Sequence, residues 1–333
     1  MLYVPILKCK QGEKDALYSL KDSVKDEIVP LLEITPDVVA KGNFNGVEDF
    51  WKDRPFILDI SPEYRQELSD EEYYKLIGKC NKEQAIPVIK LADNEERITR
   101  LIAEYANGVA LRLYLHEILD DDFELNYDEF STKLDLRNTD LIIDVQHVES
   151  SKINEASFLI RGALNLIEGI GGEYRNVIFS SNSFPETLQV EKYELSAIPR
   201  VETNLFEKVK PYFSKKKVNL IYSDYSINHW SFFEFVRGMQ PSFNIRYTAE
   251  DFYIVYKGDT VKKGGLKIEK VQEGCNLLVS SIYFKGKDYS WGDNEIHEKA
   301  TGETTRPGGL TTWRAIGTNH HITFIVDLLS SQS

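Results

Sequence analysis

Eight strand-like apolar runs, each followed by enough chain for a helix, occupy roughly the first 225 residues of the sequence. They begin roughly 23–42 residues apart, which is the length of one strand–helix unit. The runs are nearly continuous in Val, Ile and Leu, as in parallel strands that are covered on both faces. The predicted strands are residues 2–7, 29–34, 55–60, 86–91, 109–115, 141–148, 176–181 and 218–222.

Amphipathic helices fit between these strands. Residues 13–25, 94–105 and 153–167 each place apolar side chains on one stripe, and Ser69 followed by three acids is typical of a helix start. Eight such units with right-handed crossovers close into a (β/α)8 TIM-like barrel, which is the fold that we predict. An open doubly wound α/β sheet is the alternative. Its glycine-rich first turn is missing, because residues 8–12 contain one glycine.

The regular spacing ends near residue 225. We therefore predict a barrel over residues 1–225 and a C-terminal extension over residues 226–333 that packs on it. Residues 264–284 have a helical pattern and are expected to supply the final barrel helix, and residues 243–260 alternate like a β-hairpin. The glycine-rich residues 285–319 are predicted to form a long loop, and residues 321–328 a last strand.

The composition limits where the protein works and what it binds. The net charge is −13, from 53 acidic and 40 basic residues, which disfavours a broad nucleic-acid-binding face. No apolar run reaches the ~18 residues of a membrane span, and the N-terminus lacks the pattern of a signal peptide. Three widely spaced cysteines argue against a disulfide framework. We expect a cytoplasmic protein with no membrane contact.

Charged side chains interrupt the ends of six predicted strands at corresponding positions. Active sites of such barrels lie at the carboxyl ends of the strands, so these residues form the candidate site. An unpaired buried charge is costly, and each of them must therefore pair with another charge or bind a ligand. In chain order they are Lys8, Glu33, Asp59, Lys90, Arg112 and Asp144, with the polar residues Gln146, Asn182 and Asp224 at the ends of strands six to eight.

Two interpretations of these residues stay open. In the first, the three basic side chains hold the phosphate or carboxylate of a ligand, with help from the three polar residues. Catalysis then rests on the three carboxylates of the first six strands, as general acid and base or as ligands of a divalent cation such as Mg²⁺. In the second, the same groups neutralise one another as internal ion pairs. The expected pairs are Lys8 with Glu33, Lys90 with Asp59, and Arg112 with Asp144.

A second group of candidates lies between residues 285 and 321, in the stretch that we expect to act as a lid over the site. His320 is a candidate catalytic base, and Trp313 and Arg314 are candidate ligand-binding residues. In a strand, the adjacent His320 and His321 would point to opposite faces. Each has an ordinary structural alternative, since a backbone partner can hold a histidine and a core can hold a tryptophan.

Six segments spread over the whole chain carry a resemblance to a known family. They are YVPILKCKQGEKDAL (3–17), VPLLEI (29–34), YSDYS (222–226), RYT (246–248), SWGDNEI (290–296) and TTWRAIGTNHHI (311–322). In these segments the chain resembles the beta protein family of bacteria and phages. The resemblance implies a TIM-type barrel and a role in antiviral defence, and it assigns no catalytic residue.

These patterns predict a barrel that binds an anionic small molecule or nucleotide, as a hydrolase or lyase acting on a phosphorylated or nucleotide-like ligand in phage defence. The alternative is a non-catalytic sensor or scaffold that binds a phage component or a partner protein of a defence system, for which an acidic surface suits a basic partner. A metal-dependent nucleic-acid enzyme ranks last because of the net charge. No P-loop, Rossmann, zinc-protease or nucleophile-elbow motif narrows the reaction further.

Overall fold

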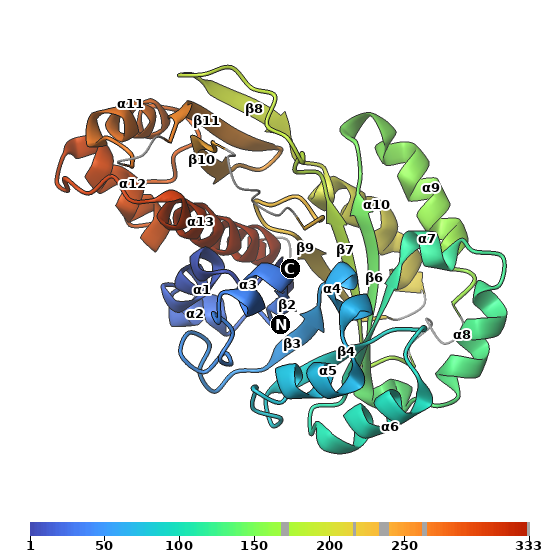
Figure 1. The fold of residues 1–333 in the computed structure, drawn as a ribbon. Coiled ribbons are helices and arrows are strands. Elements are labelled where there is room, and N and C mark those ends of the chain that lie inside the picture. The colour runs from blue at the N-terminus through green and yellow to red at the C-terminus, as the bar shows by residue number, and fades with distance from the viewer. Residues whose placement is uncertain (168–172, 216–217, 233–239, 262–264, 332–333) are drawn as a thin grey trace. The chain divides into compact units, whose positions relative to one another are not determined.

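The computed structural model describes residues 1–167, 173–215, 218–232, 240–261 and 265–331 (Figure 1). Contacts between Cα atoms divide the chain into two compact units. The barrel unit holds Met1–Cys9, Ile28–Ser183 and Val201–Tyr225, and the second unit holds Lys10–Glu27, Phe184–Arg200 and Ser226–Ser333. Residues 10–27 and 184–200 therefore group with the C-terminal third of the chain.

Eight parallel strands form a closed barrel, so the predicted (β/α)8 TIM-like fold is confirmed and the open sheet is excluded. Each of the eight predicted barrel strands overlaps an observed one, and the strands follow one another around the barrel in chain order. The barrel strands are β1 (Tyr3–Leu7), β2 (Leu31–Ile34), β3 (Phe56–Ile60), β4 (Ala85–Ile89), β5 (Val109–Tyr114), β6 (Thr139–His147), β7 (Asn176–Asn182) and β9 (Leu220–Asp224).

Helices alternate with these strands in the barrel unit. The predicted helix starts at Ser69 and Asn94 are confirmed, because each side chain accepts a hydrogen bond from the first turn of its helix. The helices are α3 (Pro36–Ala40), α4 (Pro62–Glu67), α5 (Asp70–Ile77), α6 (Glu95–Glu104), α7 (Leu115–Ile118), α8 (Phe123–Ser131), α9 (Ile153–Ala163) and α10 (Glu202–Lys215), with 3-10 turns at Leu136–Asn138 and Ser150–Lys152.

The strand registers place charged residues above apolar ones inside the barrel. Residues that are register partners on parallel strands share a face, and Leu31 on β2 is the partner of Ile57 on β3. Two residues further along, Glu33 is the partner of Asp59 on that same face. The apolar layer thus lies toward the amino ends of the strands, and the polar layer caps it at their carboxyl ends.

The second unit contains a three-stranded antiparallel sheet with helices packed on it. β10 (Ser242–Thr248) and β11 (Phe252–Thr260) form the predicted hairpin, and β8 (Leu195–Pro199) pairs with β11. The helix predicted over residues 264–284 contains α11 (Ile268–Val279), which packs on β11 and α12 in this second unit. Residue 264 lies outside the described residues. The other helices are α1 (Gln11–Tyr18), α2 (Asp22–Lys25), α12 (Trp291–Thr301) and α13 (Leu310–Ser331).

The loop predicted over residues 285–319 and the strand predicted over residues 321–328 are wrong, because α12 and α13 occupy most of this region. Nearly every residue of α13 from Trp313 to Val326 is buried. A helix that is covered on all sides has no polar face, and its sequence therefore lacks an amphipathic period. Within the described residues, no helix is both long enough and apolar enough to cross a membrane.

Two glycines of this region serve close packing rather than a flexible loop. A Cβ on Gly292 would lie 2.3 Å from the carbonyl oxygen of Ile316, so α12 approaches α13 at a distance that only glycine allows. A Cβ on Gly317 would lie 2.7 Å from the carbonyl oxygen of Arg246 on β10. Both glycines thus let α13 pack directly on backbone.

Gly292→Ala should destabilise the protein by about 1–3 kcal/mol, because backbone on both helices must move to admit the methyl group. Gly162→Ala is the matched control. Gly162 lies in α9, is exposed and has open space around its Cβ position, so alanine there should stabilise the helix slightly. Urea unfolding followed by circular dichroism measures both, and equal effects of the two changes would contradict the packing described.

Candidate functional site

Arg112 lies at the centre of the polar layer, and its guanidinium group is fully committed. Its Nε and Nη2 both donate to Asp144 Oδ2, at 3.0 and 2.6 Å. Its Nη1 donates to Glu33 Oε1 and to Asp59 Oδ2, each at 2.8 Å, and Nη2 also donates to Tyr225 Oη at 2.7 Å. These five contacts match the five N–H groups of a guanidinium, so Arg112 keeps no donor for a ligand.

The acceptors of Arg112 come from four different parts of the barrel. Glu33 is on β2, Asp59 on β3 and Asp144 on β6, and Tyr225 follows β9. The Tyr225 hydroxyl also donates to Asp144 Oδ2, at 2.5 Å. A side chain on β5 that reaches all of them must point into the barrel, which places the charged strand ends in its interior.

The three predicted ion pairs are confirmed. Arg112 pairs with Asp144 at 2.6 Å. Lys90 Nζ lies 3.4 Å from Asp59 Oδ2. Lys8 Nζ lies 3.9 Å from Glu33 Oε2. The contact of Lys90 is longer than those of Arg112, so Lys90 is held less tightly than the arginine.

A second ring of charges that sequence reasoning missed surrounds Asp59. Arg65 from α4 forms a close ion pair with Asp93, and its Nη1 lies 3.5 Å from Asp59 Oδ1. Arg97 also pairs with Asp93 and lies over the ring of Tyr73, as Arg65 does. These residues lie on helices and loops beyond the strand ends, where neither spacing nor alternation marks them.

The surrounding charges set the protonation of the layer. Burial alone would raise the pKa of Asp59, but Lys90, Arg112 and Arg65 outweigh burial and lower it. Burial alone would lower the pKa of Arg112, but the neighbouring tyrosines and carboxylates hold it well above its usual value. Burial raises the pKa of Tyr114 and Tyr225 well above the ordinary range, so both hydroxyls stay neutral.

Lys90 differs from the other cations of the layer. Burial, joined by the nearby charges of Arg112 and Arg65, lowers its pKa to about 8, although Asp59 acts in the opposite direction. Asp59 is shared among three cations, so Lys90 is poorly compensated. Its Nζ also lies 3.3 Å from the Tyr114 hydroxyl, and 4.5 Å from the centre of that ring.

The layer does not form a metal site. Within the described residues, no three His, Cys, Asp or Glu side chains are grouped so that they could hold a metal ion. The three carboxylates that were candidates for Mg²⁺ surround a guanidinium group instead, and a divalent cation would have to displace Arg112 from five hydrogen bonds.

The polar residues of the last three strands take different places. Asp224 accepts hydrogen bonds from the hydroxyls of Tyr3 and Tyr222, at 2.5 and 3.0 Å. Strand alternation puts these groups on the face opposite Tyr225, so Asp224 lies outside the polar layer. The backbone N–H of Gln146 donates to Asp144 Oδ1, and Asn182 contacts the ring of His147 instead.

Gln146 has a backbone φ of 59°, and Cys9, which follows Lys8, has a φ of 51°. Side chains other than glycine rarely adopt this left-handed conformation, which is found preferentially at functional sites. Both residues stand where the chain leaves a strand at the carboxyl end of the barrel.

Two of the C-terminal candidates, His320 and Trp313, are engaged within the second unit. His320 Nδ1 lies 2.8 Å from Asp293 Oδ2 and its Nε2 lies 2.9 Å from the Thr248 carbonyl oxygen, while the ring stacks on Tyr247. Both ring nitrogens thus have partners on neighbouring elements. Trp313 is part of the core of this unit, and its indole N–H donates to the Pro307 carbonyl.

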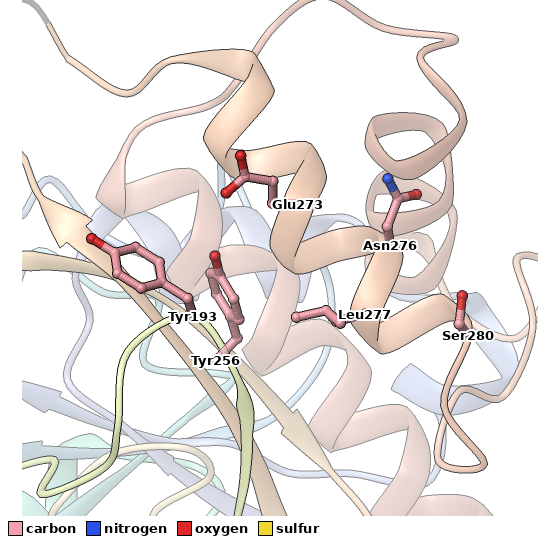
Figure 2. A pocket seen from close by; sticks show the side chains of 6 residues that line it. All are labelled: Tyr193, Tyr256, Glu273, Asn276, Leu277 and Ser280. Atoms are coloured by element: carbon pink, nitrogen blue, oxygen red, sulfur yellow. The ribbon is translucent and has the colours of Figure 1, made fainter.

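The second unit also has an open hollow of about 430 Å³ between α11 and the sheet (Figure 2). Its lining is mostly apolar, with Tyr193 and Tyr256 facing Glu273 on the helix. Glu273 is already paired with Lys270 at 2.9 Å. The hollow contains none of the residues that the sequence pattern singled out.

The similarity to known proteins extends over nearly the whole chain. The family model described as Beta protein matches residues 3–327. The chain belongs to the beta protein family. A curated relative, Protein beta of Enterobacteria phage P4, is 22% identical over 349 residues, a match that covers 98% of this chain and 93% of the phage protein. The six segments that suggested the family all lie within the matched range.

Replacing Arg112 by methionine should destabilise the barrel by about 3–5 kcal/mol at neutral pH, because three buried carboxylates then lose their shared partner. Arg100→Met is the control, since Arg100 is an exposed arginine in a pair within α6 and its loss should change little. Urea unfolding measures both changes, and a fully folded Arg112→Met protein of unchanged stability would contradict this account.

The wild-type barrel should lose stability in acid. The pKa of Asp59 is lowered in the folded state, so its stabilising contribution is present above the unfolded pKa of about 4 and is lost as the pH falls below that value. In Arg112→Met, the loss of stability between neutral and acidic pH should be smaller, because protonated carboxyl groups need no cation. Unfolding at a series of pH values measures the effect, and parallel pH profiles for the two proteins would contradict it.

Proposed function

We propose that the carboxyl end of the barrel binds an anionic small molecule, whose phosphate or carboxylate group is held by Lys8 and Lys90. In this proposal Arg112 and its three carboxylates are the rigid floor of the site rather than its ligands. Lys90 is the group that exchanges a proton with the bound molecule. The substrate class is a phosphorylated or nucleotide-like compound, and the reaction class is that of a hydrolase or lyase.

The contrast between the lysines and Arg112 carries the proposal. Lys8 and Lys90 are each 8% exposed, whereas Arg112 is 1% exposed and Asp144 is completely buried. The lysines therefore lie on the solvent side of the layer. The long contact of Lys90 to Asp59 leaves room for a stronger anionic partner.

A buried hydroxyl supports a ligand or water at this layer. Ser180 is fully buried, and its Oγ has no hydrogen-bond partner among the described residues. Ser180 is the register partner of Asp144, so the two side chains share the inner face of the barrel. An unmet buried hydroxyl is destabilising unless something binds it.

Proton transfer is assigned to Lys90 rather than to the carboxylates. Asp59 has a lowered pKa, so it is not a good acid near neutral pH. Asp144 accepts four hydrogen bonds and is committed to the network around Arg112. With a pKa of about 8, Lys90 exists in both protonation states around neutrality, which is what general acid–base catalysis requires.

A non-catalytic sensor or scaffold is the second candidate function. The complete engagement of Arg112 favours it, since a saturated network can fix a binding site without taking part in chemistry. Its occupant would be a phage component or a partner protein of a defence system. Retention of ligand binding with no chemical change in the ligand would distinguish this function from an enzyme.

We also propose a role in antiviral defence from a cytoplasmic location. Support comes from the family and from the phage origin of the curated relative, and the three cysteines are buried thiols. Phage plaque counts on cells with and without the gene test the role. Unchanged counts across a broad phage panel would contradict it.

Pyridoxal 5′-phosphate, an anionic aldehyde, should label Lys90 faster than an exposed lysine at neutral pH. A pKa of about 8 leaves roughly one Lys90 in ten as the free amine at pH 7, far more than an ordinary lysine. Borohydride reduction and peptide mass spectrometry locate the label, with Lys41, which follows α3, as the exposed reference. The rate at Lys90 should rise with pH and level off above about 8.

Inorganic phosphate should protect Lys90 and leave Lys41 unaffected, and Lys90→Met should lose the fast label. The proposal fails in its anion-binding part if phosphate gives no protection. It fails in its proton-transfer part if Lys90 reacts no faster than Lys41, or with a rate that keeps rising at high pH.

A further inference from the structure

Two arginines of the second unit converge on one backbone carbonyl. Arg246 lies in β10, and its Nη1 donates to the Ile227 oxygen at 2.7 Å. Arg314 lies in α13, and its Nη1 donates to that same oxygen at 3.5 Å. Two guanidinium groups therefore share a single neutral acceptor, although their like charges repel each other.

Neither arginine pairs with an acidic side chain in the part of the chain that the structure describes. Arg246 Nε donates to Asn244 Oδ1 at 2.9 Å, which is again a neutral acceptor. Within the described residues, no carboxylate forms an ion pair with either guanidinium. Arg246 Nη2 has no hydrogen-bond partner there, nor do Nε and Nη2 of Arg314. Fixed, unused N–H groups on two neighbouring arginines are a ready set of donors.

One carboxylate, Glu13 of α1, acts on this pair from further away. It is itself engaged, with Oε1 accepting from Asn228 and Oε2 from the backbone N–H of Lys10. Burial holds the pKa of both guanidinium groups below the usual value, and the charge of Arg314 lowers that of Arg246 further, while Glu13 acts in the opposite direction. The positive charge of the pair is thus only partly compensated.

The local packing holds the two side chains in place. A Cβ on Gly12 would lie 2.9 Å from the Arg314 Cβ, so α1 approaches the arginine stem closely. The guanidinium carbon of Arg246 lies 4.5 Å from the centre of the Phe184 ring. Ordered arginines with unused donors are preorganised for a planar or tetrahedral oxyanion.

We infer that Arg246 and Arg314 form a binding site for a phosphate-type oxyanion. This site concerns residues of the second unit and goes beyond the function proposed for the barrel. The bound group is a phosphate or diphosphate, because two guanidinium forks supply more donors than one carboxylate accepts. Three of the segments that mark the family supply Glu13, Arg246 and Arg314.

Inorganic phosphate and pyrophosphate are the probes, measured by calorimetry and by thermal unfolding. Arg314→Met keeps the apolar stem beside Gly12 and removes one charge. Glu13→Gln keeps an acceptor for Asn228 and removes the opposing charge. Arg306→Gln is the matched control, because Arg306 is an exposed arginine that precedes α13.

Arg314→Met should weaken pyrophosphate binding about tenfold or more, since charged hydrogen bonds to the anion are lost. It should also raise the unfolding midpoint of the ligand-free protein, because one of two repelling charges is gone. Glu13→Gln should have the opposite effects, with tighter binding and lower ligand-free stability. Arg306→Gln should behave as wild type.

A merely structural Arg314 would give a different pattern. The inference is overturned if Arg314→Met lowers ligand-free stability, or if it leaves pyrophosphate binding unchanged. Failure of the barrel proposal is separable, because Lys90→Met should leave the effect of Arg314→Met on pyrophosphate binding intact. Arg314→Met should likewise leave the labelling of Lys90 unchanged.

Discussion

The five hydrogen bonds of Arg112 hold the polar end of the barrel together. They join acceptors from β2, β3 and β6 and from the residue after β9, so four parts of a closed sheet meet on one side chain. A buried guanidinium is tolerable only with its full set of acceptors, and buried carboxylates only with a shared cation. Each of the charges that interrupt the strands therefore requires the others. The fold determines which of them stay available to a ligand.

Regular patterns in the sequence predict some parts of the site and miss others. The regular spacing of strand–helix units predicts the barrel. Charges at the strand ends predict the three ion pairs, because alternation along a strand determines which side chains share a face. Tyr114 and Tyr225 escaped notice because a tyrosine near a strand end resembles ordinary core. The sequence pattern also selects Asp224 for the site, although a shift of one residue along the strand places its side chain on the opposite face of the barrel wall. The helix α13 was missed because complete burial erases the amphipathic period.

Availability separates the cations of this protein into two kinds. Arg112, Arg65 and Arg97 form close ion pairs with carboxylates and serve the structure. Lys90 shares its carboxylate with two arginines, and no carboxylate among the described residues forms an ion pair with Arg246 or Arg314. An acidic protein with a net charge of −13 nevertheless keeps positive groups without full compensation, and anionic ligands are the chemistry that such groups favour.

Nitrogen-15 NMR of the arginine side chains tests the central claim most directly. With all five N–H groups bonded, Arg112 should show separate Nη hydrogens whose rotation is slow and which are protected from exchange with water. Arg246 and Arg314 should show unprotected hydrogens until phosphate is added. A single averaged, rapidly exchanging Nη signal for Arg112 would contradict the closed network on which this account rests.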